Sequence, residues 1–289
     1  MKLAIASGKG GTGKTTVAVS LALSLATREP APLYLDCDVE EPNAALYLRP
    51  AIAMQQEVGL LIPVVDAAAC TLCGRCADVC QYHAIAVIGD SVLVFPELCH
   101  GCGSCTRQCP AHAIHEELDP IGVLERGHAG SIEFAHGTLA LGKAMAVPVI
   151  RQLKQWAIPR ESAGRPVILD APPGTSCPVV ETMRGADAVL LVTEPTPFGL
   201  HDLRLAVQVA RDELGLPVGV VVNRDGVGDA GVDDFCAAEA VPILERIPLD
   251  RAIAEGIAEG RTLVDIRPEV AGRLVALWDR MSAWVEDAR

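Results

Sequence analysis

Residues Lys2–Thr15 read KLAIASGKGGTGKT. The first six residues are a short apolar run that fits a buried strand, and the next eight match the phosphate-loop pattern G-x-x-x-x-G-K-[ST]. In such loops backbone N–H groups surround the phosphates, while Lys14 reaches the β- and γ-phosphates and the Thr15 hydroxyl binds Mg²⁺. Apolar residues then recur at helical spacing from Lys14 to Thr27, which predicts a helix whose N-terminus faces the phosphates. The residues expected to bind nucleotide here are Gly8, Lys9, Gly10, Gly11, Thr12, Gly13, Lys14, Thr15 and Thr16.

Three further apolar runs each lead to a polar residue. Leu33–Leu35 precedes the acidic stretch that contains Asp38, Val167–Asp170 ends in an acid, and Val218–Val222 leads to Asn223. Because open α/β sheets bind ligands at the carboxyl ends of parallel strands, we expect these side chains and the phosphate loop at one sheet edge. Taken singly, Asp38 and Asn223 could instead be turn or helix-cap residues.

Composition bounds the size and the make-up of the core. The chain has 289 residues, of which 50% are apolar and only 3% aromatic. That length allows one large domain and a small one, with a core of Ala, Val, Leu and Ile. From the strand, loop and helix at the start of the chain and the polar residues at later strand ends, we expect a doubly wound, mostly parallel α/β domain. The formal net charge of −13 argues against nucleic acid as a partner.

Eight cysteines form two runs of the pattern C-x2-C-x2-C-x3-C, the second followed by Pro110. This is the spacing of bacterial ferredoxins, in which three thiolates of one run and the last of the other hold a 4Fe–4S cluster. The expected ligands of one cluster are Cys70, Cys73, Cys76 and Cys109, and those of the other are Cys99, Cys102, Cys105 and Cys80.

Zinc sites and disulfides are the competing interpretations of these cysteines. Zinc is held by paired Cys-x2-Cys spacings, and disulfides suit small secreted chains. The doubled runs favour clusters, and His-Ala-Ile follows each run at His83 and His112. We expect both histidines at the surface or behind the ligands, with the Ala and Ile residues packed over the clusters. We place this ferredoxin-like α+β domain at residues 64–117, inserted into an ATPase domain of residues 1–63 and 118–289.

The flanks of this segment are assigned more coarsely. Ile121–Arg126 and Ile132–Ala135 are predicted to be short strands, and Val147–Trp156 a helix. Within residues 66–117 there are two basic and six acidic residues. A partner protein that docks there is expected to present a basic surface, although ordinary solubilising charge explains the excess equally well.

The second lysine of the loop, Lys9, makes K-G-G-T-G-K-T-T resemble the deviant phosphate loop of the MinD/ParA/nitrogenase-iron-protein ATPases. The resemblance implies that Lys9 contacts the ATP of a second subunit, so that ATP closes a homodimer or a heterodimer with a paralogue. It also implies that Asp38 orients the attacking water, that Asp170 holds Mg²⁺ through water, and that Asn223 reads adenine. Lys9, Lys14, Asp38 and Asp170 would then carry ATP hydrolysis.

The resemblance extends over nearly the whole chain. Thr193–Thr196, which opens a helix near Gly199–Asp212, and Ile247–Asp250 are similar to segments of the MinD-superfamily branch that carries an inserted two-cluster ferredoxin domain. Cys177 lies seven residues after Asp170, in the segment that resembles the family's second switch, where the nitrogenase iron protein has a cysteine that ligates a cluster shared between subunits. No second cysteine suits such a site, so we expect packing, with a redox or transient-ligand role as the alternative.

Two further features of the sequence concern packing: two cysteines outside the paired runs, and the C-terminal segment. Cys37 and Cys236 are expected to be packing residues. Val270, Leu274, Leu277, Trp278, Met281 and Val285 form an apolar stripe at helical spacing in the C-terminal segment. Its charges balance, whereas membrane-surface helices are rich in Lys and Arg, so we expect it to pack against the domain.

These features predict a cytoplasmic ATPase with two 4Fe–4S clusters, ATP and Mg²⁺. Only Met1–Ser7 precede the loop, a stretch too short for a signal peptide, and no apolar run reaches the length of a membrane span, so we expect no stable membrane insertion. The leading hypothesis is that hydrolysis, slow unless a partner or reduction stimulates it, controls electron delivery or metallocofactor handling on a redox or metallocofactor protein. One alternative is a MinD-like positioning or scaffold protein whose clusters sense redox state or dock a partner. Another is an iron–sulfur cluster carrier.

Overall fold

The computed structural model describes residues 1–159 and 164–287. Its main strands are β1 Lys2–Ala6, β2 Leu33–Asp36, β3 Ala51–Val65, β6 Ile114–Ala129, β7 Ile132–Leu139, β8 Val167–Asp170, β9 Ala188–Thr193, β10 Val218–Asp225 and β11 Ile243–Pro248. Within the described residues these nine strands form one sheet in the order β11-β10-β9-β1-β8-β2-β7-β6-β3. Neighbours from β11 to β7 are parallel, and β6 and β3 add an antiparallel edge. The predicted doubly wound, mostly parallel α/β fold is confirmed.

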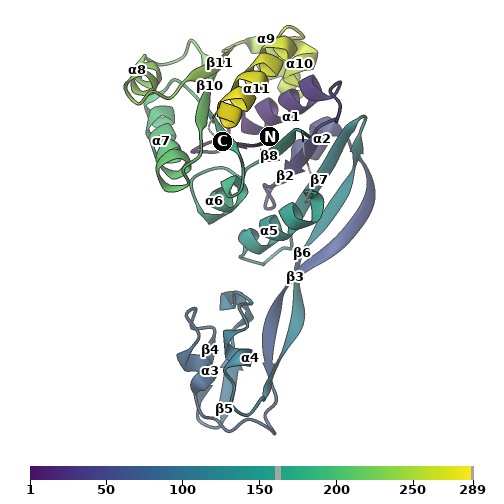
Figure 1. The fold of residues 1–289 in the computed structure, drawn as a ribbon, viewed down its shortest axis with the longest axis vertical. Helices are drawn as coiled ribbons and strands as arrows, with labels where there is room; N and C mark the ends of the chain where they lie inside the picture. Colours follow the sequence, from purple (N-terminus) through teal and green to yellow (C-terminus); the bar gives the residue numbers. More distant parts are fainter. Residues whose placement is uncertain (160–163, 288–289) are drawn as a thin grey trace.

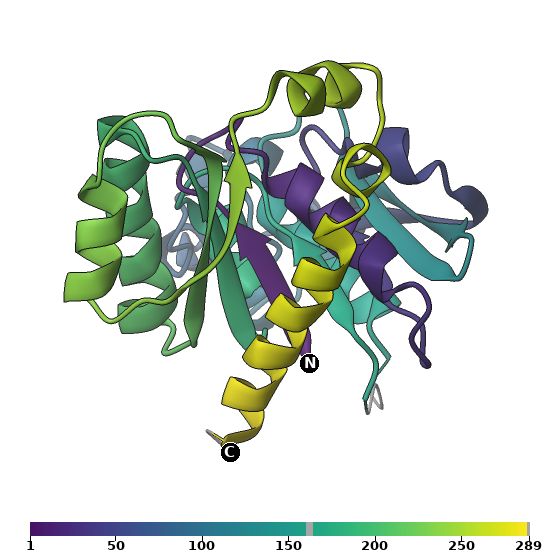
Figure 2. The ribbon, with the colours of Figure 1, turned by 90° about the horizontal axis from the view of Figure 1, so that it is seen from above.

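Helices cover both faces of this sheet (Figures 1 and 2). They are α1 Lys14–Leu25, α2 Ala44–Leu48, α5 Ala146–Ala157, α6 Cys177–Met183, α7 Pro197–Val207, α8 Gly231–Ala238, α9 Arg251–Ala258, α10 Leu263–Ile266 and α11 Val270–Asp287. Residues of α1, α2, α10 and α11 share one core with Leu3 and Ile5 of β1, while α5 to α8 share the other with Ala4 and Ala6. This division follows from the alternation of side chains along a strand.

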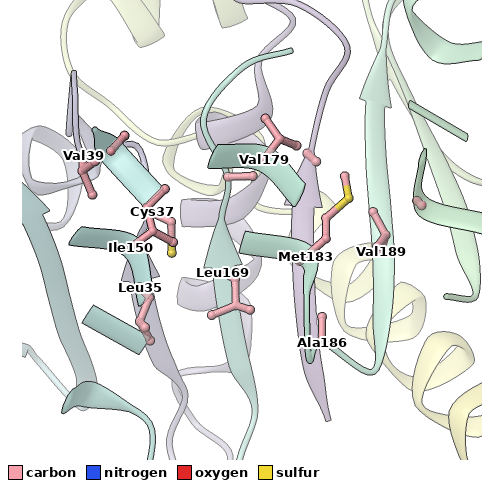
Figure 3. Packing of buried hydrophobic residues seen from close by; sticks show 14 of the residues in the cluster. Leu35, Cys37, Val39, Ile150, Leu169, Val179, Met183, Ala186 and Val189 are labelled. Atoms are coloured by element: carbon pink, nitrogen blue, oxygen red, sulfur yellow. The ribbon is translucent and has the colours of Figure 1, made fainter. Parts of the chain in front are cut away.

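Small aliphatic side chains fill the core between the sheet and α5 to α8. Figure 3 shows part of it, including Leu169, Val179 and Val189 from three different elements. Cys37 lies in this core, and Cys236 of α8 is also buried there. Both cysteines are therefore packing residues, as expected.

The C-terminal helix α11 packs against the domain. All six residues of its predicted apolar stripe are buried, and they share a core with α1 and β11. That interpretation of the tail is confirmed. In the described part of the chain, no helix combines the length and the apolar content needed to span a bilayer.

The antiparallel edge of the sheet differs most from expectation. The strands predicted at Ile121–Arg126 and Ile132–Ala135 are the inner parts of β6 and β7, and β3 carried no strand prediction. Ala51–Glu57 is exposed along its whole length, so it lacks the apolar alternation of a half-buried strand. The predicted domain limits at 64 and 117 fall inside β3 and β6, which run on as one paired ribbon (Figure 1).

Residues 66–113, here called the cysteine-rich segment, join the far ends of that ribbon (Figure 1). Its elements are α3 Arg75–Asp78, β4 Ile85–Ile88, β5 Ser91–Val94, a 3-10 turn at Pro96–Leu98 and α4 Ser104–Arg107. β4 and β5 pair as an antiparallel hairpin. Its small core contains Cys76, Ile85, Cys105 and Ile114. The segment is thus a compact unit carried at the end of two strands.

Candidate nucleotide site and cysteine sites

The phosphate loop lies at the carboxyl edge of the parallel strands. It lines a cavity of about 460 Å³ together with Asp38, Asn223 and Pro248. α1 begins at Lys14, within the last residues of the phosphate-loop pattern. Its N-terminal N–H groups therefore face this cavity. The sheet order places β1, β8, β2 and β10 so that the predicted acids and Asn223 reach the same edge.

Lys14 and Asp170 form a buried ion pair at the base of the cavity. Lys14 Nζ lies 2.9 Å from Asp170 Oδ1, and the two side chains are 7% and 0% exposed. Tyr34 on β2 donates its hydroxyl to the other carboxylate oxygen at 2.8 Å. Burial favours the neutral amine, but the adjacent Asp170 carboxylate outweighs it and raises the pKa of Lys14. Lys14 is therefore a buried cation at the place where phosphate would bind.

Two acids at the end of β2 have different surroundings. Asp38, which the sequence predicts as a site residue, lines the cavity, and partial burial raises its pKa. Asp36 was not predicted; it is fully buried and accepts backbone N–H groups of Asp38 and Ala44. Burial and repulsion by Asp170 raise the pKa of Asp36 to about 7. Side-chain alternation along β2 was the available signal, since it puts Asp36 on the same face as Tyr34.

Asp36 is expected to make the nucleotide-free protein less stable as pH rises from the ordinary carboxyl value of 3.8 to about 7. In this window the folded chain keeps a proton that the unfolded chain releases, so the free energy of unfolding falls with pH. Asp36→Asn removes the titration and should flatten that dependence. Urea denaturation of both proteins at several pH values measures it; equal slopes would contradict the burial of an ionisable Asp36.

The ends of β9 and β10 hold the phosphate loop through three side chains. Asn223 Nδ2 donates to Thr12 O at 2.7 Å, and Arg224 donates to Gly11 O at 3.2 Å. Arg224 also donates to Glu194 at 2.8 Å, and Lys9 Nζ lies 3.5 Å from the same carboxylate. Arg224 and Glu194 were not predicted, because no phosphate-loop pattern includes them. In the single chain Lys9 is therefore paired within its own subunit.

The backbone conformation of Gly13 and its close contact with Asn223 both disfavour a side chain at this position. Its φ is +90°, and a Cβ there would lie 2.3 Å from Asn223 Nδ2. We expect Gly13→Ala to lower the free energy of unfolding of the nucleotide-free protein by about 2 kcal/mol or more. Gly10→Ala is the matched control, because its Cβ would meet only Pro173 at 3.9 Å. Denaturant titration compares the two; equal losses would show that the Asn223 contact does not restrain the loop.

The eight motif cysteines gather in two sets, as their spacing predicts. Cys70, Cys73, Cys76 and Cys109 line one small cavity, here called the first cysteine site. Cys80, Cys99, Cys102 and Cys105 line another, the second cysteine site. Ile114 borders the first site, Ala84 and Ile85 border the second, and His83 and His112 are exposed.

The backbone around both sites is arranged to donate to sulfur. Leu72 and Gly101 N–H groups point to Cys70 and Cys99 Sγ at 3.5 Å. Ala84 and Ala113 N–H groups point to Cys80 and Cys109 Sγ at 3.3 Å. Such N–H donors favour thiolate over thiol.

The cysteines of each site are the kind of ligand that holds an iron–sulfur cluster. A four-iron cluster needs thiolates spread around its corners, and each site has four cysteines, two of which accept backbone N–H groups. Within residues 1–159 and 164–287, no group of three or more Cys, His or acidic side chains is arranged around one metal ion. The residues present therefore fit the group that their spacing implies.

Cys177 does not match its prediction. It was expected to pack near the switch segment, but it is exposed at the first residue of α6. The segment after Asp170 leaves the sheet edge at this point, so the apolar neighbours that a packed cysteine needs are lacking. The packing interpretation is wrong for Cys177.

Comparisons with known proteins agree with this geometry. The model of the CobQ/CobB/MinD/ParA nucleotide-binding domain matches residues 3–264. Protein MJ0578 of Methanocaldococcus jannaschii is 32% identical over 287 residues, covering 99% of this chain and 98% of its own length. An iron–sulfur cluster carrier protein of Synechocystis is 26% identical and covers 93% of this chain and 66% of its own length.

The solved structure of the septum site-determining protein MinD of Pyrococcus horikoshii, complexed with Mg-ADP, has the same fold. Its TM-score is 0.56 at 20% identity, with 98% of this chain and 97% of that chain covered. The family match spans the phosphate loop, both switch acids and Asn223. The chain therefore belongs to the CobQ/CobB/MinD/ParA family of nucleotide-binding proteins.

Proposed function

We propose that the protein is an ATPase that binds two 4Fe–4S clusters and couples nucleotide-driven rearrangement of a dimer to electron transfer or metallocofactor handling on a protein partner. One observation carries the proposal: in the sheet only β7 separates β2, which leads to Asp38, from the β3–β6 ribbon that bears both cysteine sites. β3 alone has fifteen residues and spans about 50 Å at a strand rise of about 3.3 Å per residue. The coupling would therefore act through displacement of the ribbon strands.

The nucleotide site supplies the residues that hydrolysis needs. Lys14 Nζ lies 3.5 Å from Thr15 Oγ1 and 2.9 Å from Asp170 Oδ1, so a hydroxyl and a carboxylate flank the lysine amine. Oxygen ligands of this kind suit Mg²⁺. We assign phosphate binding to Lys14, Mg²⁺ binding to Thr15 and Asp170, and orientation of the attacking water to Asp38. Asn223 would recognise adenine.

Lys9 links the site to a dimer, either of two identical chains or with a paralogue. By resemblance to the family, Lys9 contacts ATP of the second subunit. It must then leave Glu194, with which it pairs in the single chain. Arg224 remains as a partner for Glu194, at 2.8 Å. Exchange of partners by Lys9 would thus be one local change that accompanies closure.

Val58–Gly59 of β3 and Pro120–Gly122 of β6 form the part of the ribbon that we call the neck. Val58 pairs with Gly122 but Gly59 pairs with Pro120, so Ile121 is an extra, bulged residue. Bulges bend a strand and increase its twist. From Pro120 towards the cysteine-rich segment β6 pairs only with β3, whereas from Gly122 onward it also pairs with β7. The neck is therefore where the ribbon leaves the sheet.

One chain of contacts joins the neck to Asp38. The Leu139 N–H, at the end of β7, donates to the carbonyl of Val39 at 2.7 Å, and Val39 follows Asp38. The N–H of the next residue, Ala140, donates to the carbonyl of the bulged Ile121 at 2.8 Å. A displacement of Asp38 on nucleotide binding would reach the neck through these two hydrogen bonds.

A second chain joins the neck to the segment after Asp170. α6 follows that segment, and Arg151 of α5 pairs with Glu181 of α6 at 3.0 Å. Lys154 of α5 donates to three carbonyls at the end of α6, among them Thr182 at 3.0 Å. On the same helix, Gln152 Nε2 donates to Gly59 O at 3.1 Å. Through the end of β7 and through α5, the segments that follow Asp38 and Asp170 are thus both connected to the neck.

The test compares ATP hydrolysis by anaerobically reconstituted protein in its oxidised and chemically reduced states. We expect the rate to differ between the two states, and to show no difference in the Cys73→Ser/Cys102→Ser double variant. Gln152→Ala should keep ATP turnover but shrink the redox effect, because it removes only the Gly59 contact. Equal rates in both states of the wild type would contradict coupling, and a chain that takes up no iron would overturn the cluster assignment.

Iron–sulfur cluster delivery is the second candidate, favoured by the similarity to the Synechocystis carrier protein. It predicts transfer of iron and sulfide to an apo-protein, at a rate that nucleotide changes. Four cysteines with N–H donors around each site favour retention of both clusters, so we place delivery second.

A further inference from the structure

The cysteine-rich segment repeats itself, so each position at one cysteine site has an equivalent at the other. Leu72 and Gly101 are equivalent, and both have positive φ, +56° and +62°. Gly74 and Gly103 are equivalent, at +77° and +70°. The repeat therefore provides an internal comparison of two sites with the same ligands.

Among the differences between the two halves of the repeat, one involves two aromatic rings in contact. Tyr82, two residues after Cys80, and His100, one residue after Cys99, stack with ring centroids 3.7 Å apart and planes 12° from parallel. Both rings line the second cysteine site. Their equivalents at the first site are Ala111 and Thr71, which line that site at the corresponding positions.

Burial differs at one of the four equivalent ligand pairs. Cys99 is 8% exposed and its equivalent Cys70 is half-buried, whereas the members of each other pair share the same degree of burial. Gly101 lies against β3, where a Cβ would come 3.3 Å from Leu60 Cδ2 and from Leu61 O, but its equivalent Leu72 is 38% exposed. The first site is bordered by the exposed Arg75. The two rings therefore add cover at the second site that has no aromatic counterpart at the first.

We propose, on the basis of the proposed function, that the Tyr82–His100 stack makes the two clusters differ in their access to small molecules. The cluster at the second cysteine site is retained and shielded from water. The cluster at the first cysteine site is the more accessible to small molecules and is the first to lose iron to a chelator. Solvent access is one of the factors that set cluster properties, so this difference is a functional one.

The experiment follows the loss of iron from the reduced, reconstituted protein after addition of 2,2′-bipyridyl, with iron counts and the visible absorption as readouts. Bipyridyl is uncharged, so Arg75 does not attract it. We expect two phases of equal size, the slower one from the second site. Cys73→Ser should leave only the slow phase, and Cys102→Ser only the fast one.

The decisive variants exchange the covering pair between sites. Tyr82→Ala/His100→Thr should accelerate the slow phase by about two- to tenfold, the range that the free energy of one aromatic contact allows. The reciprocal Thr71→His/Ala111→Tyr should slow the fast phase. All four positions are on the surface or border the cavities, and far-UV circular dichroism checks that the variants fold.

The outcomes separate this inference from the proposed function. A single phase in the wild type, or a slow phase unchanged by Tyr82→Ala/His100→Thr, would overturn the inference while leaving eight bound irons and the proposed function intact. Failure to bind iron at all would overturn the proposed function first. Two phases that change as described would support both.

Discussion

Lys14→Met is expected to lower the free energy of unfolding of the nucleotide-free protein by about 3–5 kcal/mol, in addition to abolishing ATP hydrolysis. The reason is the carboxylate left behind. Asp170 is fully buried, and without Lys14 its remaining side-chain partner is the Tyr34 hydroxyl. Removing one member of a buried pair leaves a charge in a medium that solvates it poorly. Urea denaturation with and without MgATP measures the stability, and release of phosphate from ATP measures hydrolysis.

MgATP supplies an internal check on this prediction. Ligand at about a hundred times its dissociation constant stabilises a protein by about 2.7 kcal/mol, and only the wild type should gain this. The double variant Lys14→Met/Asp170→Asn removes the orphaned charge and should recover more than half of the lost stability without restoring hydrolysis. A Lys14→Met protein as stable as the wild type would contradict the buried ion pair.

Loss of the clusters is expected to unfold the cysteine-rich segment while leaving the nucleotide site intact. The small core of this segment contains Cys76, Ile85 and Cys105, closed by Ile114 of β6, and units this small usually need metals or disulfides to fold. In Cys73→Ser/Cys102→Ser, hydrogen exchange should lose protection across residues 66–113. ATP binding should persist, because the phosphate loop and its contacts lie in the main sheet.

The single substitutions calibrate this result. Cys73→Ser and Cys102→Ser should each reduce bound iron from about eight to about four per chain, since we propose one four-iron cluster at each site. Cys236→Ser is the matched control, because Cys236 is buried in the main domain, away from both cysteine sites. Full protection of residues 66–113 in the iron-free double variant would show that the segment folds without clusters.

The sequence predicted the parts of the structure that follow from local patterns. The phosphate loop and α1 are encoded by adjacent residues, and the stripe of α11 by helical periodicity. The grouping of cysteines into two sites follows from spacing alone. Asp38, Asp170 and Asn223 could be placed at one edge because strand ends meet there in a parallel sheet.

The features that were missed depend on contacts between distant residues. β3 begins with seven exposed residues, so its pairing with β6 stabilises it more than its own pattern does. Cys177 is exposed because α6 starts at the sheet edge, which no local pattern shows. Tyr82 and His100, which stack on each other, are eighteen residues apart in the sequence and lie in two different loops. The repeated cysteine pattern gives no sign of this contact.

The account rests on energetic coupling between the nucleotide site and the cysteine sites through the neck. The most direct test is the midpoint potential of each cluster, measured by anaerobic EPR titration without nucleotide and with MgATP. For a one-electron centre a shift of about 59 mV corresponds to about 1.4 kcal/mol of coupling, and reduction must change ATP affinity by the same free energy. We predict a shift of tens of millivolts in at least one cluster that Gln152→Ala diminishes. Identical potentials with and without MgATP would contradict the coupling.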